Sequence, residues 1–202
     1  MPSIRPLLLV LVLAALATAG QAADRTQPRP SLERIAVDPA LIDVGDGDTV
    51  VIRWGEGDRE RIRILGIDTP EIAHASLGWY DDQPYGPEAT AFAQGVFAVA
   101  ETVELLRAAE TDGYGRTLGY LFVNGRNFSV LAVAAGYAVE TVSHYGDNGL
   151  PAEAEAVLAA SRSVGPVAFE PPHQFRRRMR ELNDWREAKE EQENMQPAGG
   201  SD

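Results

Sequence analysis

Residues 40–54, ALIDVGDGDTVVIRW, contain two short β-rich runs on either side of a Gly/Asp cluster. Valine, isoleucine and tryptophan favour strands, and Asp46-Gly47 is a strong signal for a tight turn between antiparallel strands. A second Gly/Asp turn at residues 55–58 leads into residues 59–68, RERIRILGID, in which isoleucine and arginine alternate. The stretch therefore predicts a three-stranded meander with one apolar face.

Two further strands and several helices are predicted downstream. Residues 86–88, Gly-Pro-Glu, place proline in the first helical turn, where its missing N–H is tolerated, and apolar residues follow at helical spacing. Apolar patterns and Gly-bearing turns indicate strands at residues 102–106 and 117–123 and helices at residues 130–135 and 151–161. Five short strands with helices between and after them predict an α+β fold, a small Greek-key β-barrel.

The N-terminal segment has the composition of a targeting sequence. Residues 1–22 contain Arg5, an apolar run, and small residues at Gly20 and Ala22, which is typical of a cleaved signal peptide. The apolar run is shorter than the roughly 20 residues of a spanning helix, so an uncleaved anchor is the less favoured alternative. We expect an exported protein, periplasmic or secreted, with no stable membrane association after cleavage.

The remaining chain divides into three parts by composition. Residues 23–38, which contain two prolines, are interpreted as a flexible leader, residues 39–169 as the folded domain, and residues 170–202 as a charged C-terminal tail. In the tail, residues 176–194 predict a helix with arginines early and glutamates late, a polarity that opposes the helix dipole. The last residues, 197–202, are expected to be disordered.

Composition narrows the possible classes of function. The chain has 202 residues, a formal net charge of −12 and no cysteine, which excludes disulfide scaffolds, thiolate zinc sites and cysteine nucleophiles. An acidic protein does not hold nucleic acid through its net charge alone. A polyanionic substrate would therefore have to be bound by a local group of residues. We expect a monomer.

Three polar clusters are candidates for chemistry, although each alone has a plainer interpretation. Asp46-Gly47-Asp48 suits a hairpin turn, residues 68–71 (Asp-Thr-Pro-Glu) suit a helix start, and Arg63 and Arg116 suit a solvated surface. Together they supply hard carboxylate oxygens for a calcium-type ion, a spare carboxylate to activate water, and two guanidinium groups for a phosphate. These are the parts needed for metal-assisted phosphodiester hydrolysis.

The order and spacing of the motifs resemble the staphylococcal-nuclease-like thermonucleases. The matching stretches, from about residue 39 to residue 167, are ALIDVGDGDTVVIRW (40–54), RIRILGIDTPEIAH (61–74), YGPEATAF (85–92), TDGYGRTLGYLFVNG (111–125) and LAVAAGYA (131–138). The resemblance implies an OB-type five-stranded barrel with three helices. It also implies a calcium-dependent nuclease in which water displaces the 5′-oxygen of DNA or RNA and leaves 3′-phosphate ends.

The resemblance implies a role for several residues of this chain. Asp48 and Asp68 resemble the carboxylate calcium ligands, and the carbonyl of Thr69 resembles a third ligand. Glu71 resembles the residue that activates the attacking water. The two arginines, Arg63 and Arg116, resemble the pair that binds the scissile phosphate.

Residues for substrate contact match the family less closely. Tyr85 and Tyr114 stand at two motif tyrosines of the family, whereas Gly113 stands where the family usually has a lysine. Base stacking is assigned to Tyr145, or to Trp79 or Tyr80 in the loop at residues 73–83, with local packing as the alternative. The acidic surface leads us to expect short single-stranded or unpaired DNA or RNA as the substrate.

Two expectations depend on geometry. Arg63 and Asp68 are five residues apart, so regular strand alternation would place them on opposite faces, and a bulge or sharp twist at Gly66 is needed to bring them into one pocket. The arginines at positions 176, 177, 178 and 180 form the basic run of the tail; we interpret it as a solvated helix face, with a nucleic-acid contact as the alternative.

Two other functions remain open from the residues. One is a non-catalytic OB-type module of the cell envelope that binds a partner through its acidic surface. The other is a structural calcium-binding protein. Arg63, Glu71 and Arg116 are all present, and only phosphate chemistry requires the three together, which favours the nuclease.

Overall fold

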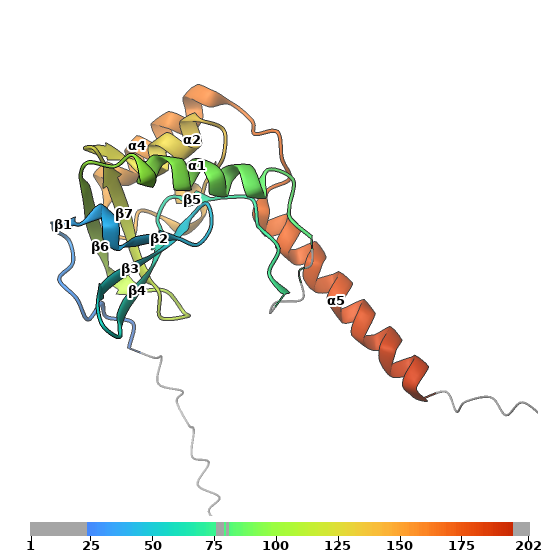
Figure 1. Cartoon of the computed structure of the whole chain (residues 1–202). Coiled ribbons are helices and arrows are strands. Elements are labelled where there is room, and N and C mark those ends of the chain that lie inside the picture. Colours follow the sequence, from blue (N-terminus) through green and yellow to red (C-terminus); the bar gives the residue numbers. More distant parts are fainter. Residues whose placement is uncertain (1–23, 76–78, 80, 196–202) are drawn as a thin grey trace, which may run out of the picture.

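A computed structural model describes residues 24–75, 79 and 81–195 of the chain. Its main feature is a curled sheet in the strand order β1-β6-β7-β4-β3-β2, with β8 paired to β7 (Figure 1). The strands are β1 (Arg34–Val37), β2 (Ile42–Val44), β3 (Thr49–Gly55), β4 (Asp58–Ile64), β6 (Val103–Thr111), β7 (Thr117–Val123) and β8 (Arg126–Asn127). All pairs are antiparallel except β4 with β7, which run parallel and connect the two halves of the sheet.

The predicted meander, β2-β3-β4, forms one half of this sheet. Strands β3 and β4 form a hairpin in which Val50 is paired with Ile62, and both side chains are fully buried. Arg61 in the same hairpin is exposed, as the alternation predicts. Apolar residues of β6 and β7 complete one continuous core with those of β3 and β4. The predicted α+β class is confirmed, with β2, β3, β4, β6 and β7 corresponding to the five expected strands.

Five α-helices and one short 3-10 helix, η1 (Pro39–Leu41), accompany the strands in the described part of the chain. The helices are α1 (Gly86–Ala98), α2 (Phe128–Ala134), α3 (Val142–Tyr145), α4 (Pro151–Val164) and α5 (Pro172–Met195). Helices α1, α2 and α4 gather on one side of the curled sheet (Figure 1). A separate two-stranded pair joins β5 (Ile67–Asp68) to β9 (Val139–Glu140).

The N-terminal part of the described chain lies along the sheet. Its strand β1 pairs with β6 from Arg34 opposite Leu106 to Val37 opposite Val103. Upstream of it, the Gln27 side chain donates to the hydroxyl of Thr117 at 3.1 Å. Sheet pairing and a buried side-chain hydrogen bond thus join part of residues 24–38 to the sheet.

The charged tail forms one long helix, α5, which begins beside the loop that follows β5 and extends away from the sheet (Figure 1). Within the described residues, no helix is long and apolar enough to cross a bilayer. The expected signal peptide at residues 1–22 and the expected disorder of residues 197–202 both lie outside the described residues.

Candidate active site

The Gly/Asp turn between β2 and β3 carries the first candidate carboxylate. Asp46 Oδ1 accepts a hydrogen bond from the backbone N–H of Asp48 at 3.0 Å, which stabilises the turn. Asp48 is buried, and its Oδ2 accepts from the N–H of Thr69 at 3.0 Å. A Cβ at Gly47 would lie 2.6 Å from the Thr69 hydroxyl oxygen, so only glycine allows this close approach. The turn therefore brings Asp48 against the segment that follows β5.

The predicted juxtaposition of Arg63 and Asp68 is confirmed. Gly66 has a φ of 81° between β4 and β5, and this left-handed residue reverses the direction in which the following side chains point. Arg63 Nη2 then donates to Asp68 Oδ1 at 2.9 Å, and Arg63 Nη1 forms an ion pair with Asp48 Oδ1. One guanidinium group thus lies between two buried carboxylates.

Glu71 is held through its backbone by Gln83, a fully buried residue just before α1. The N–H of Gln83 donates to the Glu71 carbonyl at 2.9 Å, and the N–H of Glu71 donates to the Gln83 side-chain oxygen at 3.1 Å. A Cβ at Gly86 would lie only 2.1 Å from the same Glu71 carbonyl oxygen. The start of α1 therefore packs directly on the backbone of Glu71.

Arg116 lies at the start of β7, in the turn that follows β6. Its backbone N–H and Nε both donate to the Asp112 carboxylate, at 2.8 Å and 2.6 Å, and its guanidinium group lies 5.8 Å from the Tyr114 ring. The parallel register places Thr117, its neighbour, opposite Ile62, one residue before Arg63. Arg116 is close enough to Arg63 for their charges to interact. Arg116 therefore lies in the neighbourhood of Arg63 and is itself paired to Asp112.

A third guanidinium group completes the site, and the sequence analysis missed it. Arg176 of α5 donates from Nη1 to Asp68 Oδ1 at 3.0 Å and from Nη2 to Asp68 Oδ2 at 2.8 Å. Its Nη1 also contacts Glu71 Oε1. The interpretation of the basic run as a solvated helix face is wrong for Arg176, because its side chain is only 25% exposed. The available signal was an apolar spacing, Phe175 and Met179, in an otherwise charged helix.

The tyrosines predicted to contact substrate differ in packing. Tyr85 precedes α1 and packs on Phe169, with ring centroids 5.9 Å apart. Tyr114 and Tyr145 are exposed, at 90% and 66%. Trp79 is buried against Phe175 of α5, which confirms local packing rather than base stacking for this residue. Tyr80 lies outside the described residues.

Comparison with known proteins agrees with this arrangement. The model of the family described as staphylococcal nuclease homologue matches residues 61–162. The chain belongs to this family. Among similar proteins, the thermonuclease of Staphylococcus intermedius is 36% identical over 94 residues, which cover 46% of this chain and 53% of that protein. The thermonuclease of Staphylococcus hyicus is 32% identical over 98 residues, 48% of this chain and 56% of that protein. The chain thus spans about half the length of these relatives.

The staphylococcal nuclease family match includes most of the candidate site. Within the matched range lie Arg63, Asp68, Thr69, Glu71 and Arg116. Asp48 precedes the range, and Arg176 follows it. The guanidinium group of α5 is therefore supplied by a part of the chain that the family model does not match.

Burial shifts the pKa values of two carboxyl groups at the site of this staphylococcal nuclease homologue. Burial raises the pKa of the Glu71 carboxyl above its usual range, although the hydrogen bond from Arg176 acts in the opposite direction. Burial likewise raises the pKa of Asp46, against the opposing charge of Arg63. Burying these ionised carboxylates without their arginine partners would lower the stability of the fold, because ionised groups lose hydration when buried.

The oxygen atoms at this site are of the type that binds a hard divalent cation. Asp48 and Asp68 present buried carboxylate oxygens next to the backbone of Thr69, and calcium prefers such oxygen ligands. In the described part of the chain, no group of three or more His, Cys, Asp or Glu side chains is close enough to hold a metal ion. A backbone carbonyl such as that of Thr69 would thus be needed beside the two aspartates. Guanidinium groups neutralise both aspartates in this structure.

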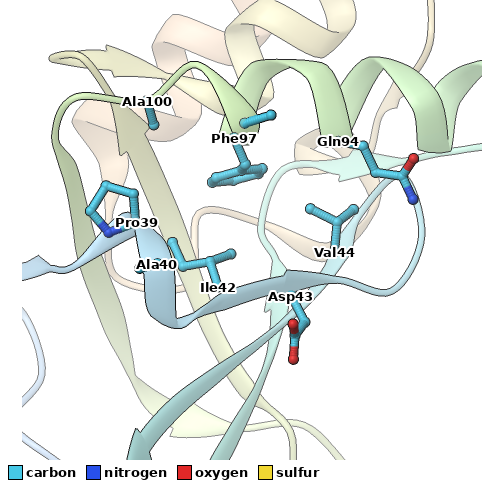
Figure 2. A pocket seen from close by; sticks show the side chains of 9 residues that line it. Pro39, Ala40, Ile42, Asp43, Val44, Gln94, Phe97 and Ala100 are labelled. Carbon is cyan, nitrogen blue, oxygen red and sulfur yellow. The ribbon is translucent and has the colours of Figure 1, made fainter.

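A shallow groove between β2 and α1 is a poorer candidate for chemistry. Figure 2 shows Phe97, Ile42 and Val44 around it, with Asp43 directed away from Phe97. The Asp43 carboxylate forms an ion pair with Arg53. The lining offers no second titratable side chain, so an acid–base pair is absent from the described lining of the groove.

Proposed function

We propose that this protein is a calcium-dependent nuclease that hydrolyses phosphodiester bonds of nucleic acid. The observation that carries the proposal is the convergence of Arg63, Asp68 and Glu71, which come from β4, β5 and the following loop, at one site. Paired carboxylates beside guanidinium groups suit the stabilisation of a phosphorus centre that gains negative charge. Membership of the staphylococcal nuclease family supports the same chemistry.

The proposed roles follow from the charge and position of each side chain. Arg63 and Arg116 bind oxygens of the scissile phosphate, because guanidinium groups bind phosphate bidentately and keep their charge. Glu71 orients the attacking water and accepts its proton. Attack on phosphorus with departure of the 5′-oxygen would leave a 3′-phosphate end.

The cation site is proposed at the same carboxylates. Asp48, Asp68 and the Thr69 carbonyl would hold calcium, which supplies electrostatic stabilisation of the developing phosphorane charge when bound. Gly47 and the hydrogen bond from Thr69 to Asp48 keep two of these groups adjacent. In this proposal, the two arginines bind the phosphate and the two aspartates bind the cation.

Substrate choice and location are further parts of the proposal. Tyr85, Tyr114 and Tyr145 are all exposed and are suited to contact nucleotide phosphates and bases. The net charge of −12 disfavours long duplexes, so short single-stranded or unpaired DNA or RNA is the proposed substrate. We also propose export, periplasmic or secreted, on the basis of the composition of residues 1–22, and a monomeric protein.

The test is hydrolysis by the purified mature chain of single-stranded DNA, duplex DNA and RNA at low salt, with calcium and then with chelator. Glu71→Ala should remove cleavage, whereas Glu155→Ala is the matched control, because Glu155 is exposed and pairs with Arg162 on α4. Cleavage that persists in Glu71→Ala would contradict the proposed mechanism. Absence of cleavage by folded wild-type protein would favour the non-catalytic binding module.

A further inference from the structure

The carboxylates of the candidate site have an occupant from the chain itself. Both oxygens of Asp68 accept hydrogen bonds from Arg176, at 3.0 Å and 2.8 Å, and Arg63 donates to one of them as well. Arg176 also contacts Glu71. A fork of N–H donors on a carboxylate is among the stronger polar contacts in proteins. The carboxylate oxygens proposed to bind the cation and the attacking water thus already accept hydrogen bonds from Arg176.

Arg176 reaches this position because α5 has its own anchor. Phe175 meets Trp79 edge to face, with centroids 6.4 Å apart, and Met179 and Leu182 join the same small apolar cluster. The cluster is separate from the main core, and the rest of α5 extends away from the sheet (Figure 1). A small anchor of this kind opens at lower free energy than the core.

We propose that Arg176 and a divalent cation compete for Asp68 and Glu71, so that α5 acts as a built-in inhibitory element of the site. This inference rests on the proposed function for the identity of the cation site. A cation on Asp68 must replace at least part of the guanidinium fork, and two positive charges on one buried carboxylate repel each other. Undocking of α5 and cation binding are therefore coupled, and the coupling is reciprocal.

The competition predicts the sign of each variant's effect. Arg176→Gln removes the competing charge and should tighten calcium binding by about tenfold, within the usual range of such couplings. Phe175→Ala leaves every charge in place but weakens the anchor, and should tighten binding in the same direction. Arg180→Gln is the matched control, because it removes the same charge from an exposed position of the same helix. Its calcium affinity should remain that of wild type.

The experiment is calorimetric titration of calcium chloride into each full mature chain without nucleotide, after circular dichroism has confirmed folding. Tighter binding by Arg176→Gln and Phe175→Ala, with Arg180→Gln unchanged, supports the inference. Equal or weaker binding by Arg176→Gln overturns it, even if wild-type protein binds calcium and cleaves nucleic acid. If no chain binds calcium, both this inference and the calcium part of the proposed function fail.

Hydrogen exchange gives a second test that needs no variant. Because coupling is reciprocal, calcium should weaken the docking of α5 in the wild-type chain. Amides of residues 175–182 should then exchange faster with calcium than with chelator, while amides of β3 and β4 remain unchanged. Unchanged or slower exchange in residues 175–182 at saturating calcium would overturn the competition.

Discussion

Gln83 forms hydrogen bonds to both backbone polar groups of Glu71, so one buried side chain and its own N–H fix the residue proposed to activate water. Its side-chain nitrogen also donates to the carbonyl of Glu170, just before α5. The loop that carries Glu71, the start of α1 and the approach to α5 therefore meet at Gln83, which makes its side chain a positioning element for the site.

Replacing Gln83 with Ala should lower kcat more than it affects calcium binding. The change leaves the Glu71 N–H without its acceptor, which costs about 1–3 kcal/mol of unfolding free energy and frees the orientation of Glu71. Asp48 and Asp68 keep their hydrogen bonds, so calorimetric calcium affinity should be retained. Gln94→Ala, at an exposed position on α1, is the control. A parallel loss of kcat and calcium affinity would instead indicate collapse of the whole site.

Gly86→Ala should separate α1 from Glu71. The new Cβ would lie 2.1 Å from the Glu71 carbonyl oxygen, so the backbone must shift, at a cost of about 1–3 kcal/mol. A displacement near 1 Å at Glu71, the carboxylate proposed to activate water, should lower nuclease activity about 100-fold. Gly95→Ala in the same helix has no atom within 4 Å of its Cβ and should stabilise the protein by about 0.5–1 kcal/mol. Thermal unfolding measures the stability of the two variants, and a nuclease assay measures their activity. Equal stability and activity of Gly86→Ala and Gly95→Ala would contradict close packing of Gly86 on Glu71.

Local chemistry explains which parts of the site were predictable from the sequence. The Gly/Asp turn carries its own signal, and the five-residue spacing of Arg63 and Asp68 required a break at Gly66, which the structure has. The alternation in β3 and β4 similarly predicted the buried face. Each of these inferences depends on residues within a few positions of one another, where turn and strand rules apply.

Contacts between distant segments were not predictable. Arg176 meets Asp68 across 108 residues; the spacing of Phe175 and Met179 indicates that one face of the helix packs, but not which segment that face meets. Gln83 is a lone polar residue without a motif, so its burial depends on the meeting of three segments. The N-terminal segment resembles a linker in composition, but β6 has an open edge that β1 occupies. Such pairings are decided by tertiary structure rather than by local preference.

Glu60 and Arg107 form a buried ion pair inside the sheet that the sequence did not reveal either. Two parallel hydrogen bonds of 2.8 Å join them, and Arg107 also donates to the carbonyl of Pro30 at 3.0 Å. Arg107→Met should destabilise the fold by about 3 kcal/mol, because it removes the guanidinium group that donates two hydrogen bonds to the buried Glu60 carboxylate. Arg53→Met, at an exposed ion pair, should cost less than about 1 kcal/mol. Urea denaturation compares the two, and similar midpoints would show that the buried pair is not critical.

The same pair predicts how stability depends on pH. Burial opposes ionisation of Glu60, but hydrogen bonds from Arg107, Thr117 and Trp54 together hold its pKa below the usual range. A carboxyl with a lowered pKa in the folded state stabilises the protein above its unfolded pKa of about 4.3, and this contribution is lost as pH falls through the folded pKa.

Glu60→Gln isolates this contribution from that of other carboxyl groups. The difference in unfolding free energy between wild type and Glu60→Gln should be largest near neutral pH. It should begin to narrow once the pH falls below about 4.3, since Glu60 of the unfolded wild-type chain then binds a proton, and it should narrow further until the pH reaches the folded pKa. Urea denaturation of both proteins from about pH 7 to about pH 3 measures the difference. A difference that stays constant over this range would show that ionised Glu60 does not stabilise the fold.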